Sequence, residues 1–115
     1  ARLAASDWRT LVDIFTSPGG LQESIRIFLA RDLSPTERPD GFVVDGEEAD
    51  MCLYWLPLEH LVELIYRGEV QSPTMVAGTL ALALAVEQGR LDQLRPADAD
   101  WPARRAKEQR DREFN

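Results

Sequence analysis

Residues 8–32 read WRTLVDIFTSPGGLQESIRIFLARD, and this stretch decides the fold of the chain. On each of the arms 11–15 and 24–29, the odd-numbered and the even-numbered residues form two alternating sets, a pattern with a period of two. A period of two is typical of β-strands with one face buried. The two arms therefore predict a β-hairpin, or two strands that are neighbours in one sheet.

The loop between the arms contains Ser17, Pro18, Gly19 and Gly20. Proline fixes its own φ and has no N–H to donate, whereas the glycine pair lets another backbone or a ligand approach closely. These properties suit a loop that faces a ligand. They suit an ordinary wide hairpin loop as well.

Composition limits the partners. The chain has 115 residues and a net charge of −7, from 20 acidic and 13 basic side chains. Such a chain repels nucleic-acid phosphates and gains nothing from anionic lipid, so we expect no nucleic-acid or membrane partner. It can still bind a diphosphate if divalent cations bridge carboxylates and phosphate oxygens. Cys52 is the only cysteine, which excludes an intrachain disulfide and favours a cytoplasmic location.

Two helices are predicted after residue 56. The first begins at Pro57 as its first helical position and ends before Gly68, with apolar residues at intervals of three and four. The second begins with Ser72 as N-cap and ends before Gly89. Because this helix is apolar on nearly every side, we expect its burial by the chain's own sheet or by a second subunit, which favours a homodimer.

The other segments give weaker signals. We expect a turn at residues 6–7, an exposed loop over 33–41 and a third strand over 51–56. His60 is expected to be a solvated helix residue. The tail 91–115 is polar and predicts an exposed arm or helix, and Trp101 within it needs a docking site on the domain or on a second copy. The chain contains no P-loop, dinucleotide-binding, H-E-x-x-H or nucleophile-elbow motif.

Several short segments follow one another along the chain: 8–11, 17–20 with Glu23, 27–30, 47–50, 55–59 and 67–70. In this order they resemble the part of Nudix-family ADP-ribose pyrophosphatases that follows the Nudix box. The Nudix signature itself, G-x5-E-x7-R-E-U-x-E-E-x-G-U, is absent from this chain and would lie before Ala1, so we expect a truncated or processed start. Arg2 stands where that pattern would place a glycine.

The resemblance implies an α/β fold, in which residues 1–90 form the C-terminal part of a Nudix-like domain, with a mixed sheet flanked by helices. Residues 91–115 would be the polar arm. The implied reaction is hydrolysis of ADP-ribose, or a related nucleoside diphosphate sugar, to AMP and a sugar phosphate with Mg²⁺ or Mn²⁺. The metal would neutralise charge that develops on the diphosphate and acidify the attacking water.

The resemblance also assigns roles to individual residues. Glu48 would be the catalytic base or a metal ligand, with Glu47 one register step away. The backbone of Ser17, Pro18, Gly19 and Gly20, together with Glu23, would line the substrate side of the cleft. Because the box is missing, we expect these 115 residues to be inactive on their own.

Two alternatives remain open. One is a catalytically inactive, truncated Nudix-like module for protein association or ligand sensing, which Arg2 and the missing box favour. The retained loop at 17–20 and the Glu47–Glu48 pair oppose it. The other alternative is an unrelated small α/β domain.

Overall fold

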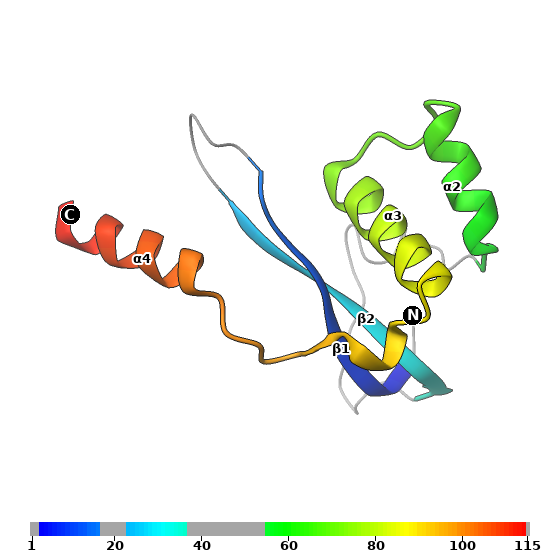
Figure 1. Ribbon diagram of the computed structural model, residues 1–115, viewed down its shortest axis with the longest axis horizontal. Helices are drawn as coiled ribbons and strands as arrows, with labels where there is room; N and C mark the ends of the chain where they lie inside the picture. Colours follow the sequence, from blue (N-terminus) through cyan, green and yellow to red (C-terminus); the bar gives the residue numbers. More distant parts are fainter. Residues whose placement is uncertain (1–2, 17–22, 37–54, 115) are drawn as a thin grey trace, which may run out of the picture.

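The computed structural model describes residues 3–16, 23–36 and 55–114 (Figure 1). A β-hairpin comes first, two helices follow it, and a short strand leads to the last helix. In order, the elements are β1 (Leu3–Phe15), β2 (Ser24–Pro35), α2 (Leu58–Tyr66), α3 (Pro73–Glu87), the 3-10 turn η1 (Leu91–Gln93), β3 (Arg95–Pro96) and α4 (Pro102–Phe114). The predicted α/β class is confirmed.

The hairpin is the longest regular unit, and the predicted pairing of its arms is confirmed. Strands β1 and β2 are antiparallel, with Phe15 opposite Ser24, and the Thr16 N–H donates to the Glu23 carbonyl over 3.0 Å. The register shifts between Thr10 and Val12, which leaves one extra residue on β1. A bulge of this kind bends a strand and increases its twist.

Both strands are longer than the sequence predicts at their outer ends. The turn expected at residues 6–7 is wrong, because β1 begins at Leu3 and continues through Asp7. The loop expected from residue 33 is wrong over its first part, because β2 continues to Pro35. Asp is disfavoured in strands, but Asp7 lies opposite Arg31, and oppositely charged cross-strand pairs stabilise a sheet.

Strand β3 completes a three-stranded antiparallel sheet in the order β2-β1-β3. It pairs through Pro96 opposite Arg9 and Arg95 opposite Thr10. Thr10 is 1% exposed, and its hydroxyl donates to the Pro96 carbonyl over 2.8 Å. The buried hydroxyl is therefore satisfied, as buried polar groups in native proteins generally are.

Helices α2 and α3 end in the same way. Gly68 and Gly89 follow the helices with φ of +77° and +65°, a backbone region that glycine adopts without a steric penalty. After α2, the Gly68 N–H donates to the Ile65 carbonyl and the Glu69 N–H to the Leu64 carbonyl. The predicted glycine stops are confirmed, whereas Pro57 is the N-cap of α2 and not its first helical residue.

Helix α3 packs against both the hairpin and α2. Thr79 and Ala85 are its buried residues, and Gly78 faces Ile27, whose Cγ2 would lie 3.3 Å from a Cβ at that position. Met75, Leu80, Leu84 and Val86 are exposed. The sheet and α2 therefore cover part of the predicted apolar surface, and these four side chains of α3 stay exposed.

The chain after η1 crosses to the other side of the hairpin. Figure 1 shows α4 and the segment before it on the side of β1 and β2 that faces away from α2 and α3. Side chains of α4 up to residue 110 are exposed or half-buried, as predicted for the polar tail. Among the described residues, no helix is both long enough and apolar enough to cross a membrane.

Candidate functional site

Asp13 and Arg26 form the most buried ion pair of the hairpin. They are opposite each other on β1 and β2, and they pair through two contacts, Arg26 Nε to Asp13 Oδ1 at 2.7 Å and Arg26 Nη2 to Asp13 Oδ2 at 3.0 Å. The Asp13 side chain is 11% exposed and the Arg26 side chain is 14% exposed. The hydrogen bond from Arg26 lowers the pKa of Asp13, against the opposing effect of burial, and the same bond raises the pKa of Arg26.

Arg26 also binds the segment that precedes α4. Its Nη1 donates to the Ala99 carbonyl over 2.6 Å and to the Ala97 carbonyl over 3.4 Å. Arg95 adds a second cation to Asp13, with its Nη2 3.1 Å from Oδ2. One guanidinium therefore connects β1, β2 and the chain between β3 and α4, a role that the planar fork of arginine suits.

A second charged cluster lies toward the other end of the hairpin. Asp7 accepts from Arg31 Nε over 2.8 Å and from Arg9 Nε over 3.1 Å, and these hydrogen bonds, that of Arg31 foremost, lower its pKa. Arg31 also pairs with Asp92 over 2.8 Å, and Arg9 donates to the carbonyls of Asp92 and Leu94. Both clusters thus attach the chain after α3 to the hairpin.

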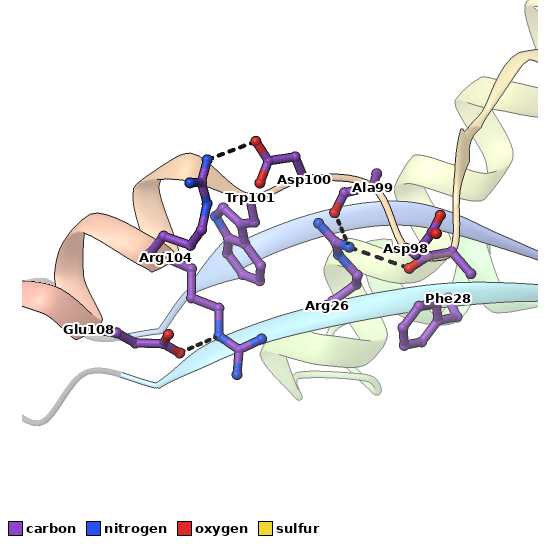
Figure 2. Close-up of a pocket in the computed structure, with 10 residues that line it drawn as sticks. Arg26, Phe28, Asp98, Ala99, Asp100, Trp101, Arg104 and Glu108 are labelled. Atoms are coloured by element: carbon purple, nitrogen blue, oxygen red, sulfur yellow. Dashed lines mark hydrogen bonds and ion pairs between the residues drawn. The ribbon is translucent and has the colours of Figure 1, made fainter.

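A pocket of about 510 Å³ lies beside the first cluster (Figure 2). The Trp101 ring lines it, with its centroid 5.5 Å from that of Phe15 and the two rings tilted by 47°. The guanidinium carbons of Arg26 and Arg104 lie 5.4 and 5.9 Å from the Trp101 ring centroid. Distances of this kind allow cation–π attraction. The prediction that Trp101 docks on the domain is confirmed.

The charges that line this pocket balance. Three arginines and three carboxylates line it, and each arginine has an acidic partner: Arg26 pairs with Asp13, Arg104 with Glu108 and Arg105 with Asp100. A phosphate would therefore have to displace existing ion pairs. The geometry suits attachment of the C-terminal segment to the hairpin better than capture of an anion.

Most of the residues predicted to carry the chemistry are not among the described residues. Ser17, Pro18, Gly19, Gly20, Glu47 and Glu48 lie outside the described residues, as do residues 51–54 of the predicted third strand. Glu23 is described and is exposed directly before β2. Trp55 and Leu56 are outside regular structure, and His60 is exposed on α2 as predicted.

The described residues offer no metal site. Among residues 3–16, 23–36 and 55–114, no group of three or more His, Cys, Asp or Glu side chains is arranged to hold an ion. The acidic side chains of the two clusters are already paired with arginines.

Sequence reasoning missed the ion pairs of the hairpin. The available signal was the register, since a hairpin closed by Phe15 and Ser24 places Asp13 opposite Arg26. The bulge at Leu11 changes the register beyond Thr10, and it is this changed register that places Asp7 opposite Arg31. The pairing of Asp13 with Arg26 could be predicted from the sequence. The pairing of Asp7 with Arg31 could not, because it depends on the bulge, which the sequence does not predict.

The hairpin, the two capped helices and the attached C-terminal segment define an α/β domain portion of the kind that the sequence motifs suggested. The chain matches no known protein-family model. It is 40% identical over 99 residues to an ADP-ribose pyrophosphatase of Mycobacterium tuberculosis (strain ATCC 25618 / H37Rv). The match covers 86% of this chain and 45% of that protein, so the chain spans less than half of the relative's length. This similarity supports a relationship to ADP-ribose pyrophosphatases.

Proposed function

We propose that the chain is part of a Nudix-type pyrophosphohydrolase that cleaves ADP-ribose, or a related nucleoside diphosphate sugar, to AMP and a sugar phosphate. The observation that carries the proposal is the 40% identity to an ADP-ribose pyrophosphatase over 86% of the chain. The hairpin, which contains the matching segments 8–11 and 27–30, supports it. Glu48, with Glu47 as the neighbouring alternative, is our candidate for the catalytic base.

We further propose Mg²⁺ or Mn²⁺ as the cofactor of the full-length protein. The described residues do not themselves fit a divalent cation, so we assign them no step that passes through the metal. Glu48 is the candidate ligand, and it lies outside the described residues. A cytoplasmic location and a homodimer belong to the same proposal, supported by the single cysteine and by the exposed apolar side chains of α3.

The test is hydrolysis of ADP-ribose by the full-length protein with Mg²⁺, followed by separation of AMP from the substrate. We expect AMP to form in proportion to enzyme and to stop when EDTA removes the metal. Binding of ADP-ribose without turnover would instead favour the catalytically inactive module for ligand sensing.

A further inference from the structure

The loop end of the hairpin, where its two strands are joined, consists of Phe15 and Thr16 on one strand and Glu23 and Ser24 on the other. Within the described residues, the Thr16 N–H to Glu23 carbonyl bond of 3.0 Å is the outermost backbone link between the two strands. Of the residues that the resemblance places on the substrate side of the cleft, Glu23 is the one that the structure describes. Because an isolated two-stranded hairpin is only marginally stable in water, this end needs support from another part of the chain.

The segment 95–101, which we call the clasp, supplies that support. It contacts β1 at Thr10 through the Pro96 carbonyl and at Asp13 through Arg95. It contacts β2 through the carbonyl of Ala99, which accepts from Arg26 over 2.6 Å. These links follow the hairpin from its middle toward its loop end.

Trp101 is the last residue of the clasp and the one nearest the loop end. Its ring packs against Phe15, the last residue of β1, with 5.5 Å between the centroids. Arg26 lies over the same ring and is three positions after Glu23. Helix α3 approaches the hairpin at Ile27, farther from the loop end than Arg26. The clasp therefore supports the part of the hairpin that lies beyond this helix contact.

We propose that the clasp sets the position of the hairpin's loop end, with Arg26 and Trp101 as positioning residues for Glu23. The consequence for substrate rests on the proposed function, because it is the resemblance to ADP-ribose pyrophosphatases that assigns Glu23 to the substrate side of the cleft. The consequence for backbone order does not rest on it. A loosened clasp should let the Thr16 to Glu23 bond open more often while α2 and α3 stay folded.

The experiment compares Trp101→Ala with wild type in the full-length protein and follows amide hydrogen exchange by NMR. We expect the Thr16 amide to exchange about tenfold faster or more, since opening free energies of local segments respond to lost packing. The Gly68 and Glu69 amides, which are bonded at the end of α2, should keep their exchange rates and so show that the domain is folded. Unchanged exchange at Thr16 would overturn the proposal.

Three further variants separate positioning from general packing. Trp101→Phe keeps an aromatic ring against Phe15 and should restore most of the protection at Thr16. Arg26→Lys keeps the charge but cannot bind Asp13 and the Ala99 carbonyl together, so it should reproduce the effect of Trp101→Ala. Tyr66→Ala, on an exposed ring of α2, is the matched control and should change nothing at Thr16.

Kinetics provide the second measurement. For Trp101→Ala we expect KM for ADP-ribose to rise about threefold to tenfold with kcat within about twofold, because Glu23 is proposed to bind substrate without taking part in bond breaking. A fall in kcat with unchanged KM would overturn the positioning role at Glu23. If wild type hydrolyses no nucleoside diphosphate sugar, the proposed function fails, and exchange at Thr16 still decides the role of the clasp.

Discussion

At the residue scale, Asp13 is more deeply buried than Asp7, the other hairpin carboxylate that binds two arginines. It is 11% exposed and accepts from both Arg26 and Arg95. A carboxylate removed from such a pair leaves a half-buried guanidinium without its partner, which generally costs about 1–3 kcal/mol. We therefore expect Asp13→Asn to lower the free energy of unfolding by about this amount at neutral pH.

The pH dependence follows from the lowered pKa of Asp13, whose ordinary value is 3.8. A carboxyl with a lower pKa in the folded state stabilises the protein above the unfolded-state pKa, and this contribution is lost as pH falls through the folded-state pKa. Urea unfolding should thus show wild type losing stability more steeply than Asp13→Asn as pH drops below about 4. Asp98→Asn, at an exposed carboxylate, serves as control, and parallel curves for wild type and Asp13→Asn would contradict the account.

Glu48 is the residue on which the proposed chemistry depends. In the full-length protein, Glu48→Gln keeps the size of the side chain and removes its charge. General-base catalysis contributes about 10²–10⁴ in rate, so we expect kcat to fall about a hundredfold or more with little change in KM. Glu47→Gln should have a much smaller effect, and Glu37→Gln, the control from the same segment, almost none.

The outcomes of this series differ in what they overturn. If Glu47→Gln is the damaging variant, the assignment is displaced by one residue. If all three variants keep near-normal kcat, the acidic segment has no catalytic role.

At the element scale, the ends of α2 and α3 depend on backbone conformation alone. A Cβ at Gly68 or Gly89 would meet nothing within 4 Å, so the cost of alanine there comes only from the positive φ. That cost is about 1–2 kcal/mol per residue. Thermal or urea unfolding of Gly68→Ala and Gly89→Ala should show losses of this size.

Ser72→Ala is the matched control at the other end of α3. The Ser72 side chain makes no capping hydrogen bond, so its removal should change the free energy of unfolding far less than the glycine variants do. A loss at Ser72 equal to that at Gly89 would contradict this reading of the helix ends.

The elements also show what the sequence can and cannot predict. Pro73 and the glycines after α2 and α3 have strong local preferences, so the helix ends could be placed from sequence. The pairing of β1 with β2 was equally accessible, because alternation and the loop residues agree. The outer ends of the strands were not, because Asp7 and Leu33 lie in strands that are completed by partners distant in the sequence. The clasp was missed for the same reason, since its contacts join residues 10–26 to residues 95–101.

At the scale of the whole molecule, the apolar surface exceeds what the described sheet covers. Met75, Leu80, Leu84 and Val86 of α3 are exposed, and large apolar side chains exposed on one helix make it a candidate interface between subunits. We expect self-association of the full-length protein in sedimentation at tens of micromolar. Leu84→Glu should shift the equilibrium toward monomer, whereas Leu33→Glu, at an exposed position on β2, should not. A monomeric wild type at these concentrations would contradict the expectation.

We propose that this chain is part of an enzyme that hydrolyses a nucleoside diphosphate sugar. The proposal rests on similarity to a protein of which the chain covers 45%. The most direct measurement is the initial rate at which the full-length protein converts ADP-ribose to AMP, with Mg²⁺ and then with EDTA. The account predicts metal-dependent release of AMP and sugar phosphate in equal amounts. A full-length protein that is folded, binds ADP-ribose and releases no AMP with either Mg²⁺ or Mn²⁺ would contradict it.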